Sequence, residues 1–169
     1  MPAAQINSID WTTLRCRSGE ASFVAVELKL LFDNPNDEDR FDNLWPYLCS
    51  EGTTHSAAYA SAPFLLELAR LATGHARFKY LYVLSLFRMC EPTAPSQRAC
   101  SPAYRESYQL ALREALPLVA ELSTQDFGYE NFYVLSALAA LKEMPRLASC
   151  IESISLEEFK CPECQEPLA

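Results

Sequence analysis

A repeated pair of segments is the feature of this sequence that most limits how it can fold. Residues 61–69, SAPFLLELA, resemble residues 115–123, ALPLVAELS, and in both a proline precedes three apolar residues and a Glu-Leu pair. The tetrapeptide YVLS follows each copy, first at 82–85 and again at 133–136. Two matches in the same order predict a repeated unit, a helix with an internal proline followed by an apolar helix. Helix pairs that cannot bury their own apolar faces stack on further copies, which predicts an α-solenoid.

The spacing of the copies is longer than the roughly 40–47 residues of a HEAT or armadillo unit. Residues 91–102, which hold three prolines, form a predicted loop that accounts for the excess. An ordinary helical bundle with a coincidental similarity is the alternative to a solenoid.

The rest of the chain is predicted to be all-α, with seven or eight helices in stacked antiparallel pairs. The four glycines lie between periodic segments, and alternating apolar runs bounded by turn signals are nearly absent. A strand over residues 23–28 is the alternative in one segment, where composition favours a helix. The expected helices cover residues 8–16, 20–32, 37–48, 56–72, 77–89, 103–123, 129–144 and 145–154. We expect a repeat domain over residues 1–154 and a tail over 155–169.

The buried side of these helices is predicted from apolar spacing. Phe41, Leu44, Trp45 and Leu48 follow an i, i+3, i+4, i+7 pattern. The fourth helix is expected to continue through its internal proline, because apolar periodicity persists beyond it. We expect Trp45, Leu48, Leu68 and Leu84 to be buried between neighbouring hairpins.

Composition narrows the class of partner. The net charge of −8 argues against nucleic acid, because phosphate binding requires an excess of Lys and Arg. No apolar run reaches the roughly 18 residues that a membrane span needs. The first residues lack the basic and apolar regions of a secretory signal, so we expect a cytoplasmic protein without a membrane partner.

The seven cysteines are interpreted mainly as free thiols. Cys16, Cys49, Cys90 and Cys150 lie in apolar helical patterns, as buried thiols in a reducing compartment do. Cys161 and Cys164 form a single CxxC pair in the tail, which is half of a zinc site. We predict metal ligation there only if further ligands complete the site, and no other cofactor.

Catalytic signatures are absent, so we predict that the protein is not an enzyme. The sequence holds no P-loop, GxGxxG, HExxH or GxSxG motif. His55 and His75 are expected at helix ends with structural roles. A Cys49–His55 pair would lie across a turn and has no third group to orient it.

One segment resembles a known family. Residues 44–48, LWPYL, precede EGT at 51–53 and AAYASAPFL at 57–65. This pattern resembles bacterial HEAT-like repeat proteins, in which a Leu-Trp-x-x-Leu helix, a Gly-Thr turn and a small-residue helix lead into Pro-x-Leu. Some members end in Cys-Pro-x-Cys-Gly, where this chain has Gln165 at the glycine position. The resemblance implies a HEAT-like solenoid and, because many such proteins are encoded beside polymorphic toxins, an immunity protein that binds a cognate toxin.

Acidic residues are the predicted contact surface for such a partner, because an acidic surface attracts and orients a basic protein. Tyrosines and tryptophans exceed what a small core needs and would supply anchors. A general protein-interaction scaffold is the alternative function. The predicted partner-binding residues fall into two groups, expected at opposite ends of the solenoid: Asp33, Asp37, Glu38, Asp39, Asp42 and Glu51 in the first, and Asp126, Tyr129 and Glu130 in the second.

Overall fold

The computed structural model describes residues 2–50, 52–90 and 100–155, and these are mainly helical, with eight α-helices. The all-α prediction is confirmed. The helices are α1 (Pro2–Asn7), α2 (Ser22–Asp33), α3 (Glu38–Leu48), α4 (Ser56–Leu71), α5 (Gly74–Cys90), α7 (Pro102–Leu122), α8 (Asn131–Leu141) and α9 (Pro145–Ser155). None of these helices combines the length and apolarity that a membrane span requires.

The helix predicted over residues 8–16 is wrong. A 3-10 turn, η1 (Trp11–Thr13), begins after Asp10, whose carboxylate accepts a hydrogen bond from the backbone N–H of Thr12. Strand β1 (Arg15–Cys16) then pairs with β2 (Gly19–Glu20). Trp11 and Leu14 are both buried, so an i, i+3 apolar spacing arose here without a helix.

A second short hairpin connects α3 to α4. Strand β3 (Cys49–Ser50) pairs antiparallel with β4 (Thr53–Thr54) around Gly52, whose φ is 71°. A positive φ at this position suits glycine, which confirms the predicted turn. Both sheets among the described residues have two strands of two residues each, too short to show alternation in the sequence.

The helix predicted over residues 129–144 is shorter than expected. It begins as a 3-10 turn, η3 (Gly128–Glu130), which continues into α8 (Asn131–Leu141). Glu143 has a φ of 64°, a left-handed backbone that ends the segment.

Burial confirms three of the four core predictions. Leu48, Leu68 and Leu84 are fully buried, whereas Trp45 is only partly buried against the core. Trp45 follows the apolar periodicity of α3 but lies at the edge of its buried stripe, where it faces a cleft described below.

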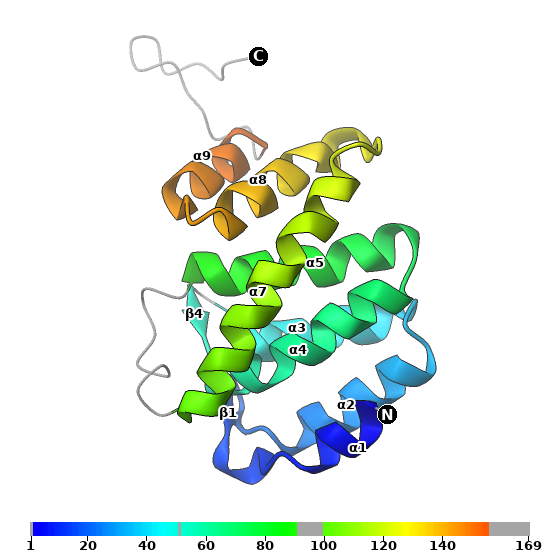
Figure 1. Cartoon of the computed structure of the whole chain (residues 1–169), viewed down its shortest axis with the longest axis vertical. Helices are drawn as coiled ribbons and strands as arrows, with labels where there is room; N and C mark the ends of the chain where they lie inside the picture. Colours follow the sequence, from blue (N-terminus) through cyan, green and yellow to red (C-terminus); the bar gives the residue numbers. More distant parts are fainter. Residues whose placement is uncertain (1, 51, 91–99, 156–169) are drawn as a thin grey trace.

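The repeated segments pack on each other. The copies of the proline segment lie in α4 and α7, which contact each other, and both helices continue through Pro63 and Pro117. The copies of YVLS lie in α5 and α8, which also contact each other. Tyr82 and Tyr133, the same position in the two copies, meet edge-on with ring centroids 5.3 Å apart. The helices run from α1 and α2 at one end to α8 and α9 at the other, with α7 crossing in front of α4 and α5 (Figure 1).

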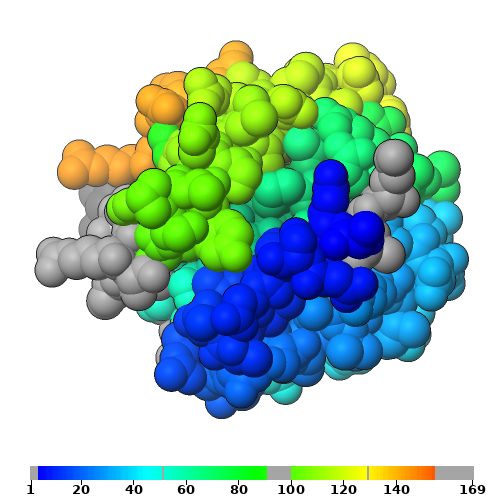
Figure 2. Space-filling view, turned by 60° about the horizontal axis from the view of Figure 1, so that its bottom comes forward, coloured from blue at the N-terminus to red at the C-terminus, as the bar shows by residue number. Residues whose placement is uncertain are grey.

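The N-terminal segment covers one end of the molecule. α1 packs on α2, and the indole N–H of Trp11 donates to the backbone oxygen of Ile6 at 2.9 Å. Seen from this end, α1 lies beside α2 and α7 (Figure 2). A hollow between α1, α4 and α7 is lined in part by Ile9, Phe64 and Leu110.

Candidate functional site

The predicted acidic residues gather around α3, whose first turn orders several of them. Asp37 caps the helix, because its carboxylate accepts the backbone N–H of Arg40 at 3.0 Å. Glu38 and Asp39 follow at the positive end of the helix dipole, where carboxylates are favoured. The cap and the dipole explain why this acidic run is the start of a helix.

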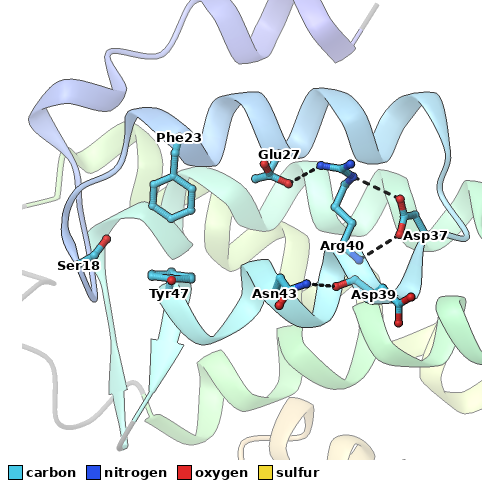
Figure 3. A pocket seen from close by; sticks show the side chains of 8 residues that line it. All are labelled: Ser18, Phe23, Glu27, Asp37, Asp39, Arg40, Asn43 and Tyr47. Carbon is cyan, nitrogen blue, oxygen red and sulfur yellow. Dashed lines mark hydrogen bonds and ion pairs between the residues drawn. The ribbon is translucent and has the colours of Figure 1, made fainter.

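One face of α3 packs towards α2 through an ion-pair network. The Arg40 guanidinium donates to Glu27 at 2.8 Å and to Asp37 at 3.3 Å (Figure 3). A hollow of about 620 Å³ lies beside this network, with Phe23 and Tyr47 at its other end, their ring centroids 5.0 Å apart. The remaining residues that line it are Ser18, Asp39 and Asn43.

The other face of α3 is tied to α5. Lys79 Nζ lies 3.0 Å from a Glu38 oxygen and 2.7 Å from an Asp42 oxygen. Partial burial lowers the pKa of Lys79, but the hydrogen bonds and charges of Asp42 and Glu38 outweigh this and raise it overall. Lys79 therefore stays protonated and holds α3 against α5.

His75, in the first turn of α5, joins the two acidic groups. Its Nδ1 lies 2.7 Å from Glu38, and its Nε2 lies 3.1 Å from Glu130 in η3. Burial alone would lower the pKa of His75, but the two carboxylates outweigh it and raise the pKa above 6.5. Glu38 responds in the opposite sense: burial acts to raise its pKa, but His75 and Lys79 lower it overall.

This contact corrects the expected placement of the two acidic groups. Glu38 and Glu130 do not lie at opposite ends of the molecule, because both reach the same imidazole. The packing of α3 and α8 on either side of α5 brings them together. We refer to Asp33, Asp37, Glu38, Asp39, Asp42 and Glu130 as the acidic surface.

A cleft of about 200 Å³ opens beside His75, between α3, α5 and α8. Phe78 and Tyr82 stack in it with centroids 5.8 Å apart, and Tyr133 meets Tyr82 edge-on. Trp45 lines it from α3. We refer to it as the aromatic cleft, lined by Phe41, Asp42, Trp45, His75, Phe78, Lys79, Tyr82, Val83, Glu130 and Tyr133.

The other predicted contact residues have different environments. Asp33 and Asp39 are exposed, and within the described ranges no side chain pairs with their carboxylates. Asp126 accepts hydrogen bonds from the Gly128 N–H and the Asn131 amide, which lower its pKa. Glu51, the Tyr129 side chain and the Cys161–Cys164 pair lie outside what the structure describes.

Cys49 and His55 do not form a pair. Cys49 is buried and contacts Thr54 Oγ1 at 3.8 Å, and its pKa is raised by a hydrogen bond with Cys90 and by burial. Burial and the charge of Arg17 lower the pKa of His55. A protonated thiol without a base beside it is a poor nucleophile.

The interpretation of the cysteines as buried free thiols is correct for some of them. Cys16 and Cys49 are buried as expected, and Cys90 is partly buried. Cys150 is exposed, which contradicts the expectation, because its side chain lies on the outer side of α9. Within the described ranges, no group of three or more His, Cys, Asp or Glu side chains is arranged to hold a metal ion.

Sequence reasoning misses the residues that connect the site. It predicts only a structural role for His75, and it does not single out Lys79 or Tyr133. The i, i+4 spacing of His75 and Lys79 places both on one face of α5, but nothing in the sequence says which helix that face meets.

Comparisons of this chain with protein-family models, with curated proteins and with solved structures found no match.

Proposed function

We propose that this chain is a HEAT-like α-solenoid that binds a basic protein through its acidic surface. The finer proposal is an immunity protein that acts in the cytoplasm and neutralises a cognate bacterial toxin. The contacts between equivalent helices, α4 with α7 and α5 with α8, support the solenoid. The resemblance around residues 44–65 supports the toxin as partner.

The observation that carries the proposal is a group of carboxylates, in excess over nearby cations, beside open aromatic side chains. Among the described residues, three carboxylates of the acidic surface (Asp37, Glu38 and Asp42), together with Glu27, pair with two permanent cations, Arg40 and Lys79, and Glu130 contacts His75. Asp33 and Asp39 remain solvated, so they attract a basic protein without first breaking an internal ion pair. Aromatic anchors with charged residues around them are the usual composition of a protein-binding hot spot.

The ion pairs give the acidic surface a second property. Arg40 fixes Asp37, and Lys79 fixes Glu38 and Asp42, so these carboxylates lose little side-chain freedom when a partner binds. Such preorganisation lowers the entropic cost of association. No step of this proposal needs a catalytic group.

The experiment is co-expression with the protein encoded by the adjacent reading frame. We expect that protein to be basic, to arrest growth when expressed alone, and to form a one-to-one complex with this chain that restores growth. Binding without restored growth would favour the scaffold function. A neighbour that neither binds nor inhibits growth would contradict the proposal.

A further inference from the structure

Large aromatic side chains of this protein have two contrasting environments in the core and in the aromatic cleft. Tyr59, Tyr80 and Tyr108 are fully buried and fill the core. Trp45, Tyr82 and Tyr133 are only partly buried, and they come together in the aromatic cleft. Three large side chains that are each partly exposed at one place leave apolar surface unburied, which is typical of surfaces that bind a partner.

We infer that the aromatic cleft receives an arginine side chain of the basic partner, an inference that rests on the proposed function and names its central contact. The charges around the cleft favour a positively charged occupant. Asp42 from α3 and Glu130 from η3 line the cleft, and Glu38 contacts its His75 and Lys79. Lys79 is the one permanent cation among the described residues that line it. An anionic group would meet carboxylates on both sides of the cleft and is disfavoured.

The size of the cleft selects a single side chain. Sites for drug-sized ligands are usually about 300–1,000 Å³, and the aromatic cleft is about 200 Å³. A helix or an extended peptide does not fit into it, but one side chain projecting from a bound protein does.

The chemistry of the walls favours arginine over lysine. A guanidinium is planar and weakly hydrated, so it stacks on an aromatic face while its N–H groups donate to carboxylates. An ammonium keeps more of its hydration and lacks a flat face. Tyr133 and Trp45 offer rings from α8 and α3, and Glu130 offers a carboxylate near the same opening.

His75 and Lys79 fix the positions of the carboxylates around the cleft. His75 spaces Glu38 from Glu130, and Lys79 keeps Asp42 and Glu38 on the α3 side. A guanidinium that enters on the α8 side reaches Glu130 without displacing Lys79. The acceptor at that side is therefore the Glu130 carboxylate.

The test uses the whole chain and two peptides, acetyl-Gly-Gly-Arg-Arg-Gly-Gly-amide and its lysine counterpart. NMR resolves the indole N–H signals of the two tryptophans, Trp45 in the cleft and Trp11 in the core. We expect the arginine peptide to shift the Trp45 signal to saturation, with a dissociation constant at least about threefold lower than that of the lysine peptide. The Trp11 signal, from an indole already bound to Ile6, should not move.

Matched variants assign the effect to the cleft. Tyr133→Ala and Glu130→Gln should each remove the preference for arginine. The control variant Tyr47→Ala also removes a tyrosine side chain, but from the other face of α3, where Tyr47 pairs with Phe23. This variant should keep the preference for the arginine peptide. If Tyr133→Ala does not fold, Glu130→Gln, which keeps every ring, still decides the question.

Equal shifts with both peptides, or a preference that survives Tyr133→Ala and Glu130→Gln, would overturn the inference. Salt-dependent binding of both peptides without movement of Trp45 would also overturn it, while the proposed acidic surface would stand. The toxin proposal is judged separately by co-expression, so the two can fail independently.

Discussion

At the scale of single residues, His75 is the point where distant parts of the chain are joined. Its ring contacts Glu38 and Glu130, and both carboxylates favour the imidazolium form. Because the folded-state pKa is raised, the stabilisation is present below the ordinary pKa of histidine and is lost as the pH rises through the raised value. Lys79 also pairs with Glu38, so it still compensates the charge of that carboxylate when His75 is neutral.

A variant at this position should therefore change the pH dependence of stability. We expect His75→Gln to lower the free energy of unfolding at about pH 5.5 and to have little effect at about pH 8.5, within the usual range of histidine titration. The difference should stay below about 1 kcal/mol, because the side chain is more than one third exposed. Urea denaturation at both pH values measures it, and a difference that grows with pH would contradict the assignment.

Neighbouring positions on α3 should differ sharply in their contribution to stability. Leu48 is fully buried, and Leu48→Ala should cost about 2–5 kcal/mol. Trp45→Ala should cost clearly less, although the side chain is larger, because part of it already faces the aromatic cleft. Denaturation midpoints of the two variants compare them directly. If Trp45→Ala lowers stability as much as Leu48→Ala or more, Trp45 belongs to the core.

At the scale of elements, Glu152 connects α9 to the helices beneath it. Its carboxylate accepts the hydroxyl of Tyr82 in α5 at 3.0 Å and that of Ser136 in α8 at 2.8 Å. Burial, followed by the charge of Glu152, raises the pKa of Tyr82, so its hydroxyl remains a donor. Both donors belong to the YVLS copies, so the repeat supplies contacts to α9 from two helices.

We expect Glu152→Ala to loosen α9 without unfolding the rest. Hydrogen bonds to a charged acceptor contribute about 1.5–3 kcal/mol, so protection of the α9 amides against hydrogen exchange should fall by about that free energy. Amides of α4 and α5 should keep their protection. Ser149→Ala on the same helix, which loses only a local bond to Pro145, serves as the control. A uniform loss across all helices would show that α9 is part of one cooperative unit.

The sequence predicted long elements better than short ones. Helices such as α4 and α5 have enough turns for apolar spacing and glycine boundaries to identify them. The hairpin that contains Gly19 has strands of two residues, and the spacing of Trp11 and Leu14 imitated a helix. Local pattern could not separate these cases, because the hairpin is held by contacts such as the Arg15 N–H to Ser56, far along the chain.

At the scale of the whole molecule, the sequence identified acidic residues but not how they meet. The prediction that the acidic run Asp37, Glu38 and Asp39 begins a helix is confirmed, since Asp37 caps α3 and the other two lie in its first turn. Its connection to Glu130 is made through His75 of α5, which contacts Glu38 of α3 and Glu130 of η3, and the periodicity of the sequence does not encode this arrangement. The cleft was missed for the same reason, because it takes its walls from three separate helices.

The whole charge distribution leads to a prediction about association kinetics. Substituting Asp37, Glu38 and Asp42 would break ion pairs with Arg40 and Lys79. Such variants would change the stability of the fold as well as the binding of a partner. Asp33 and Asp39 are exposed and have no partner among the described side chains, so Asp33→Asn with Asp39→Asn removes charge without breaking an ion pair. We expect this double variant to associate with the proposed basic partner about three- to tenfold more slowly at low salt, with dissociation nearly unchanged.

The salt dependence of the association rate distinguishes long-range electrostatic attraction from direct contact. Screening weakens interactions between exposed charges, so the double variant and the unaltered protein should converge as ionic strength rises. The control is Glu106→Gln, which removes an exposed carboxylate that has no ion pair among the described residues, and its effect is compared per charge removed. Glu106 belongs to α7, which lies in front of α4, while α3 lies behind it (Figure 1). Stopped-flow association rates at several salt concentrations measure both variants. If the control slows association as much as the double variant does, net charge governs the encounter and the acidic surface has no special part in it.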